Sequence, residues 1–410
     1  MWHGVALYLG AVIGAGVLIL PGASASLAGP ASVLAWGFDS LLGLPIALTF
    51  AALAARHPDA GGVATYTGIA FGPTVGMVIG WFYVLAAASA QSLVALTGAY
   101  YAAPHLGLDR LGVALLATAM LVVATLTNSR GLRVSGQVQL VFSAAVTVLL
   151  VLAIVVSGPR MEAERWEPFA PEGWPAVGNA AVLIFFAYFG WEAICHLSAE
   201  FRDPARDVVR STLISVVIIT VLFLGIAVAT IGTGTYGTEE LDRTAVARLL
   251  ADPLGTGVGA VAAGIAVLIA LGTANAFLAA TSRLTYALAR DGMFPSRLGR
   301  VNADGVPLPA VLAVGGFAIS CLVLATAFGW DAKDILVVPN ALVITVYAAG
   351  TAAGVVLLRG ARRVAAVIAS LLCLALLPFA GIGLLATVLI AAAALLYRRR
   401  HPGPVRAPSV

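Results

Sequence analysis

Two short stretches of this 410-residue chain place glycine and chemically useful groups inside otherwise apolar sequence. GAVIGAGVLILPG covers Gly10–Gly22, and FFAYFGWEAICHLSAEF covers Phe185–Phe201. A helix that is interrupted at glycine frees backbone N–H and C=O groups. The free N–H groups at a helix start attract an anion, and free carbonyl groups accept hydrogen bonds from an ammonium group. Together the two kinds of group predict a site for a zwitterion such as an amino acid.

The second stretch also carries an acid and a base. Glu192 and His196 are four residues apart and therefore share one face of a helix. Because histidine titrates near neutrality, the pair could relay protons. Alternatively, the two side chains could form a structural hydrogen bond that stabilises the end of the broken helix. An ionisable residue at membrane depth is a functional candidate by default, so both interpretations are kept.

The amino-acid composition indicates whether these groups lie in water or in a lipid bilayer. The chain is 61% hydrophobic and only 10% charged, with a mean hydropathy of +1.01. A soluble domain carries about 25% charged residues, so this inventory cannot build a surface that faces water. Helices satisfy their own backbone groups in lipid, and about 20 apolar residues cross the hydrocarbon. We therefore expect an all-α polytopic membrane protein whose surroundings are the lipid bilayer.

The apolar segments predict twelve transmembrane helices. The predicted spans are 4–28, 31–55, 74–102, 111–127, 134–157, 177–200, 211–231, 257–287, 308–328, 334–358, 363–380 and 382–397. With the N-terminus inside, the cytoplasmic segments carry sixteen of the 23 Lys and Arg residues and the outer loops carry six. This positive-inside bias predicts a multi-pass protein of the cell membrane with both termini cytoplasmic.

The interruptions fall near Gly14 in span 1 and Gly190 in span 6, five spans apart. Breaks at corresponding positions of two five-helix halves indicate an inverted repeat with a site at mid-membrane. Close packing of helices through small residues is the alternative explanation for the glycines. We predict a ten-helix inverted-repeat core over 1–358, two accessory helices over 359–397, and a basic cytoplasmic tail over 398–410.

Several motifs resemble the amino acid–polyamine–organocation superfamily of permeases, whose core is leucine-transporter-like. Gly10–Gly22 resembles the broken first helix of that superfamily, Phe185–Ser211 resembles its span 6 with the following loop, and Ala274–Pro295 resembles its span 8. The AGGVATYTGIAFG loop at Ala60–Gly72 and the EAICHLSAEF run resemble bacterial methionine and branched-chain amino acid exporters. The likeness covers nearly the whole chain.

The resemblance implies roles for the residues of the first interruption. The backbone N–H groups of Gly14, Ala15 and Gly16 would bind the substrate carboxylate. Carbonyl groups near Val12 and Ile13 would accept hydrogen bonds from the substrate ammonium group.

Other substrate contacts are implied in spans 3, 6 and 8. Phe189, next to Gly190 at the second interruption, would also face the ammonium group, and Phe186 matches an aromatic gate. Asn275 matches a polar residue of span 8, and Gln91 is a candidate polar wall contact in span 3. Glu192 matches an acid that the resemblance links to gating or proton movement.

The sequence departs from this pattern in span 5. Proton-coupled members often carry a lysine there, but the matching residue is Val146, and the one lysine of the chain is Lys333. Sodium coupling, antiport, and proton linkage through Glu192 or His196 therefore stay open. Asp39 in span 2 has no counterpart in the resemblance. A residue that faces water near the outer vestibule and a structural or incidental residue are both open interpretations.

These observations favour a secondary active transporter of small neutral amino acids that works by alternating access. Uptake coupled to protons or sodium, and amino acid antiport, are the alternatives within this class. A non-transporting sensor or a channel is the alternative of another class. An enzyme is not expected, because the chain has no HExxH, GxSxG or Walker-type pattern. No cofactor, metal or nucleic-acid partner is predicted.

Overall fold

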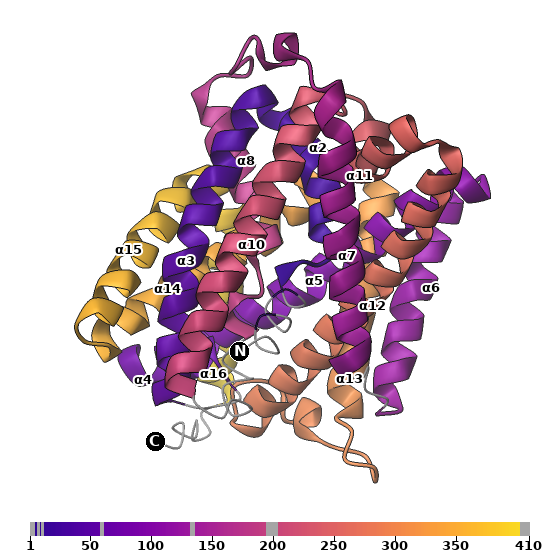
Figure 1. The fold of residues 1–410 in the computed structure, drawn as a ribbon. Coiled ribbons are helices and arrows are strands. Elements are labelled where there is room, and N and C mark those ends of the chain that lie inside the picture. The colour runs from indigo at the N-terminus through magenta and orange to yellow at the C-terminus, as the bar shows by residue number, and fades with distance from the viewer. Residues whose placement is uncertain are drawn as a thin grey trace.

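The computed structural model describes residues 5, 9, 12–57, 61–131, 136–193 and 204–401, without the side chains of 136–140, 204–209 and 256. Within these residues the chain forms α-helices and short 3₁₀ turns and no strand, as Figure 1 shows. The predicted all-α class is confirmed. His196 and the tail from 402 onward lie outside the described residues.

The elements follow the chain in an order that mixes long membrane helices with short turns. They are α2 (Gly16–Ala28), η1 (Gly29–Ala31), α3 (Ser32–Arg56), α4 (Val63–Phe71), α5 (Pro73–Leu106), α6 (Arg110–Ser129), α7 (Gly136–Ser157), η2 (Gly158–Arg160), η3 (Ala163–Trp166), α8 (Trp174–Ile184), η4 (Phe185–Tyr188), η5 (Trp191–Ala193), α10 (Pro204–Gly232), α11 (Glu239–Leu254), α12 (Thr256–Arg290), η7 (Ser296–Gly299), α13 (Leu308–Phe328), α14 (Ala332–Leu357), α15 (Ala361–Leu376), η8 (Leu377–Ala380) and α16 (Gly383–Arg400).

Nine helical stretches in the described part of the chain are long and apolar enough to cross a membrane. They are Gly16–Arg56, Pro73–Leu106, Arg110–Ser129, Val141–Arg160, Arg210–Gly232, Gly257–Arg290, Leu308–Phe328, Ala332–Leu357 and Ala361–Ala380. The first stretch holds two predicted spans, which η1 separates. The predicted spans 177–200 and 382–397 correspond to the shorter apolar stretch Trp174–Tyr188 and to α16. The chain is a multi-pass membrane protein.

Glycine and acidic caps set several helix ends. α5 begins after Gly72, whose φ is 97°, and ends at Gly107 in the left-handed region. α13 likewise ends at Gly329 with a φ of 69°. A left-handed residue after a helix satisfies its last carbonyl groups, and glycine adopts that conformation without steric cost. Asp331 and Asp334 form a capping box at the start of α14.

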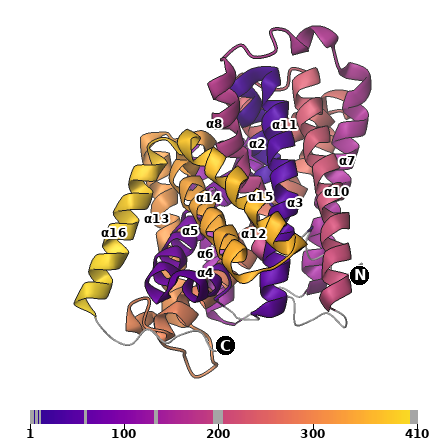
Figure 2. The same ribbon diagram turned by 90° about the vertical axis from the view of Figure 1, so that its left-hand side faces the viewer.

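The long helices α5 and α12 pack against each other, and several other helices pack on them. α6 and α13 pack against both of them, whereas α14 and α4 pack against α5. α2, α3, α8 and α10 form a second group of neighbours (Figure 1). α16 lies at the edge of the molecule in Figure 2, where it contacts α14 and α5.

Two segments without a predicted span are helical. Ala60–Gly72 was expected to be a loop, but Val63–Phe71 forms α4, which packs on α5. The acidic segment between spans 7 and 8 forms α11, which packs on α2. A Cβ atom on Gly22 of α2 would lie 2.6 Å from the carbonyl oxygen of Asp242, so the two backbones meet there without a side chain between them.

The contact of α4 with α5 gives a first testable prediction. A Cβ atom on Gly76 would lie 2.7 Å from the carbonyl oxygen of Ala64 and 2.9 Å from the Cα atom of Gly68. Backbone atoms cannot move aside as a flexible side chain can, so Gly76→Val should lower the free energy of unfolding by about 1–3 kcal/mol. Thermal unfolding of the purified protein in detergent measures this change. Gly316→Val is the control, because nothing lies within 4 Å of its Cβ position; equal melting temperatures for the two variants would contradict the prediction.

Candidate functional site

The first interruption lies directly before α2. Ile13, Gly14 and Ala15 are not helical, and α2 begins at Gly16. The N–H of Gly14 donates to the carbonyl oxygen of Val12 at 2.9 Å, which is a tight local turn rather than a helical bond. The start of a helix leaves N–H groups without intrahelical partners and carries a partial positive charge. The predicted break in span 1 is therefore present at the predicted residues.

The second interruption follows α8. The helix ends at Ile184, and η4 is followed by Phe189 in an extended conformation with φ −70° and ψ 118°. Gly190 has a φ of 137°, in the region that favours glycine. The regular helix therefore stops before Gly190, where the sequence predicts a break, and the backbone at this position favours glycine.

The two interruptions are in contact. A Cβ atom on Gly16 would lie 3.2 Å from Cδ1 of Phe186 and 3.3 Å from its Cε1. A Cβ atom on Gly14 would lie 3.2 Å from Cγ2 of Thr273 in α12. Phe186 is 8% exposed and Ala15 is fully buried. The fold thus brings Gly16 against the aromatic ring that the resemblance assigned to a gate, and Gly14 against α12.

Phe189 packs in a group of aromatic rings drawn from three helices. Its ring centroid lies 5.4 Å from that of Tyr83, 5.6 Å from that of Phe277 and 6.3 Å from that of Tyr347. These residues come from α5, α12 and α14 respectively. Sequence analysis named Phe189 but missed the other three rings, because their spacing along separate helices carries no sign of a shared partner.

Glu192 is buried with three hydrogen-bond donors around its carboxylate. The hydroxyl of Tyr83 donates at 2.7 Å, the hydroxyl of Tyr347 donates to the other oxygen, and the N–H of Gly190 donates at 3.1 Å. These donors satisfy a buried polar group that would otherwise be costly. A cavity of about 10 Å³ lies beside Glu192, next to Tyr83 and Leu284, and this is room for about one water molecule.

Gln91 of α5 is buried, and neither its side-chain oxygen nor its nitrogen has a hydrogen-bond partner among the described residues. It lies between Tyr83, which contacts Glu192, and Tyr101, whose hydroxyl donates to the carbonyl oxygen of Leu18 in α2 at 2.7 Å. A buried amide without partners is costly. Gln91 therefore has one donor group and one acceptor that no described residue uses.

Asn275 pairs with a residue of α6 and not with the described residues at the two interruptions. Its side-chain oxygen accepts a hydrogen bond from Nδ2 of Asn128 in α6 at 2.8 Å. Thr273 and Phe277, which face the interruptions, are four residues apart on α12, and Asn275 lies about 200° around the helix from each of them at 100° per residue. The helix period therefore turns Asn275 toward α6.

Val146, at the position of the lysine of proton-coupled members, is buried beside the first interruption. It lines a small cavity together with Ile13, Ser143 and Thr273. An apolar side chain thus stands where the resemblance places a cation.

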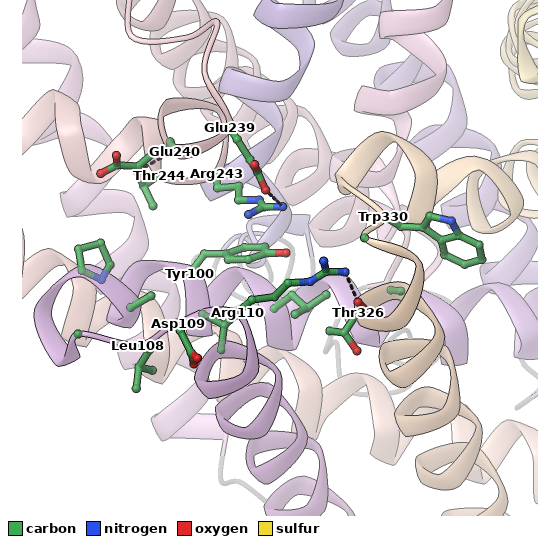
Figure 3. Close-up of a pocket in the computed structure, with 17 residues that line it drawn as sticks. Tyr100, Leu108, Asp109, Arg110, Glu239, Glu240, Arg243, Thr244, Thr326 and Trp330 are labelled. Atoms are coloured by element: carbon green, nitrogen blue, oxygen red, sulfur yellow. Dashed lines mark hydrogen bonds and ion pairs between the residues drawn. The ribbon is translucent and has the colours of Figure 1, made fainter.

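A much larger cavity of about 860 Å³ lies away from the interruptions, where α5, α6, α11 and α13 meet (Figure 3). Tyr100 lies about 25 Å along α5 from Tyr83, at 1.5 Å per residue. Arg243 of α11 stands over the Tyr100 ring, 4.3 Å from its centroid, and pairs with Glu239 and with Asp331. Because these charges are paired with one another, we do not assign the substrate to this cavity.

Comparison with known proteins decides the family. The model of the amino acid permease family matches residues 1–406. The chain belongs to this family. Among its relatives is the uncharacterized amino acid permease YecA of Bacillus subtilis (strain 168), 34% identical over 407 residues, which cover 98% of this chain and 95% of the relative.

Two further relatives of this permease have named substrates. The L-methionine/branched-chain amino acid exporter YjeH of Escherichia coli (strain K12) is 28% identical over 92% of this chain and 90% of its own length. The branched-chain amino acid permease BcaP of Bacillus subtilis (strain 168) is 28% identical over 72% of this chain and 68% of its own length. The predicted superfamily is confirmed, and with it membership among amino acid transporters.

Proposed function

We propose that this permease is a secondary active transporter of small neutral amino acids that works by alternating access across the cell membrane. The observation that supports it most is the contact between the two interruptions, at Gly16 and Phe186. Free backbone groups in a membrane are tolerated only where protein or water covers them, and broken helices that meet are the usual transporter site. The proposed architecture is two inverted five-helix halves followed by two accessory helices, with both termini cytoplasmic and α11 outside.

In the proposed complex the substrate lies between the interruptions. Its carboxylate accepts hydrogen bonds from the N–H groups at Ala15 and Gly16, where the start of α2 is electropositive. The N–H of Gly14, which donates to the carbonyl oxygen of Val12 in this structure, joins them when the substrate opens that turn. Its ammonium group donates to carbonyl groups near Val12 and Ile13. Glu192 is not assigned as its direct partner, because three donors of the protein already bind that carboxylate.

The substrate side chain would be apolar. Phe186 and Phe189 are large apolar side chains at the interruptions, and both are buried. Gln91 would contribute the polar wall contact, since its amide has no other described partner. The named substrates of two relatives, methionine and branched-chain amino acids, fit such a site.

Counterflow in proteoliposomes tests this function. Vesicles that are preloaded with unlabelled methionine or leucine should transiently accumulate the labelled amino acid, and labelled glutamate or lysine should not compete. Stoichiometric exchange separates a transporter from a channel, which would only let the label equilibrate. A protein that exchanges none of the neutral amino acids in the panel would overturn the proposal. Imposed pH and sodium gradients of either direction then distinguish export, coupled uptake and antiport.

Replacement of Gln91 by leucine should stabilise the folded protein and weaken transport. Gln91→Leu removes two buried polar atoms without partners, so the free energy of unfolding should rise by about 1–3 kcal/mol. The same change removes a proposed substrate contact, so the KM of counterflow should rise. Asn128→Leu is the contrast, since Asn128 donates at 2.9 Å to the carbonyl oxygen of Ala124 as well as to Asn275, and it should lower the melting temperature. A Gln91→Leu protein that melts below the wild type would contradict this assignment.

A further inference from the structure

Asp39 of α3 is a buried acid that the proposed substrate site does not use. Of the two interpretations of Asp39, exposure to water near the outer vestibule does not fit this structure, because the residue is only 1% exposed. Neither of its carboxylate oxygens has a hydrogen-bond partner among the described residues. Glu192, by contrast, has two hydroxyl donors and one N–H donor. The two membrane acids therefore have opposite environments.

The groups around Asp39 do not supply a compensating charge. Among the described side chains, the titratable groups in electrostatic contact with it are the hydroxyl of Tyr188 in η4 and the thiol of Cys373 in α15. The other elements that pack on α3, which are η1, α2, α8, α10, α14 and η5, bring no described Lys, Arg or His into such contact. The acid of η5 is Glu192, which is held by its own donors.

An ionised carboxylate in this environment would be buried without a donor or a counter-ion. That state is far more costly than the neutral acid. The structure therefore fits Asp39 with a proton bound, and it fits the ionised form only when water reaches the carboxylate.

The surrounding segment links Asp39 to the second interruption. The hydroxyl of Tyr188 lies 2.7 Å from Oγ of Ser40 and donates to the carbonyl oxygen of Trp36 at 3.4 Å. One turn further along α3, a Cβ atom on Gly43 would lie 3.2 Å from Nε1 of Trp191 in η5. α3 thus contacts both 3₁₀ turns that flank Gly190, which are η4 and η5. A movement of η4 would therefore change how far Asp39 is shielded from water.

We propose that Asp39 is a proton-binding site that couples proton movement to transport. The carboxylate takes a proton from water on one side when the segment around it opens, carries it as the neutral acid while η4 is packed, and returns it to water on the other side. No other bond is made or broken. This inference rests on the proposed transport function, and it names the proton as the coupling ion.

The bound proton can be measured without transport. Infrared spectra of the wild-type protein in lipid at neutral pH should contain the carbonyl-stretch band of a protonated carboxylic acid without hydrogen bonds. Asp39→Asn should remove this band. The matched control Asp304→Asn, which changes an exposed loop acid, should keep it. A wild-type spectrum without the band, or a band that persists in Asp39→Asn, would overturn the proton site.

Transport measurements test the coupling. With one proton per substrate, a gradient of about one pH unit permits about tenfold accumulation. The wild type and Asp304→Asn should reach such accumulation and should move protons with the substrate, as a pH dye inside the vesicles reports. Asp39→Asn should keep counterflow at equal pH and lose both gradient-driven accumulation and substrate-dependent proton flux.

The arms of this experiment separate the two proposals. A wild type without counterflow refutes the transport function, and the infrared arm still decides whether Asp39 holds a proton. A wild type with counterflow but no response to the pH gradient refutes the coupling alone. The same holds if Asp39→Asn accumulates substrate as the wild type does. If Asp39→Asn fails to fold, Asp39→Glu, which keeps a titratable acid, should retain the band and the coupling, and its loss of either at normal counterflow would count against the proposal.

Discussion

Gly16→Val is expected to reduce amino acid counterflow by about 100-fold while the protein still inserts into the membrane. The Cβ position on Gly16 is already 3.2 Å from the ring of Phe186, and the branched side chain of valine would push that ring away from the start of α2. It would also occupy the space where the substrate carboxylate meets the N–H groups. A misplacement of about 1 Å in a binding site can cost about 10²-fold in rate. Counterflow in proteoliposomes, normalised to the amount of reconstituted protein, measures the effect.

Gly264→Val is the matched control for this substitution. It introduces the same side chain into α12, where nothing lies within 4 Å of the Cβ position, and its counterflow should remain near that of the wild type. Equal rates for Gly16→Val and Gly264→Val would refute the placement of the substrate at the start of α2.

Removal of the Glu192 carboxylate has the second large expected effect. Glu192→Ala leaves the hydroxyls of Tyr83 and Tyr347 and the N–H of Gly190 without their shared acceptor. Each buried donor that is left without a partner costs about 1–3 kcal/mol. We expect a strongly lowered melting temperature in detergent together with loss of counterflow.

Two further variants test whether the loss of stability in Glu192→Ala comes from the lost hydrogen bonds or simply from the removal of a side chain. Glu192→Gln keeps one oxygen acceptor of similar shape, so its melting temperature should lie between those of Glu192→Ala and the wild type. Glu172→Ala removes an exposed loop acid and should change neither stability nor counterflow. Identical stabilities for Glu192→Ala and the wild type would show that the three donors find other acceptors.

The sequence predicts the interruptions well because each is a local property. Glycine within an apolar segment marks a position where the helix can end, and Gly190 indeed has a φ that other residues rarely adopt. The aromatic and acidic network is not local. Tyr83 and Tyr347 are 109 and 155 residues away from Glu192, and a tyrosine in an apolar helix gives no sign of the residue that its hydroxyl contacts.

The missed helices have a similar explanation. α4 is only nine residues long, too short to be recognised as a span, and α11 carries three acids in its first turn. α11 is a helix because it packs on α2 across Gly22, which is a tertiary contact. Asn275 shows the converse: its residue type suggested a role, and the period of its own helix places it against Asn128 instead.

The tyrosines that hold Glu192 come from α5 and α14, two separate helices, while the carboxylate itself belongs to the segment that follows α8. A single side chain therefore ties three parts of the molecule together. In a carrier whose parts tilt relative to each other, any such tilt stretches these buried hydrogen bonds, and each donor that loses its partner costs about 1–3 kcal/mol. The breaking of this hydrogen-bond network around Glu192 should then be the enthalpic barrier that limits turnover. The rate of amino acid exchange should therefore fall steeply on cooling.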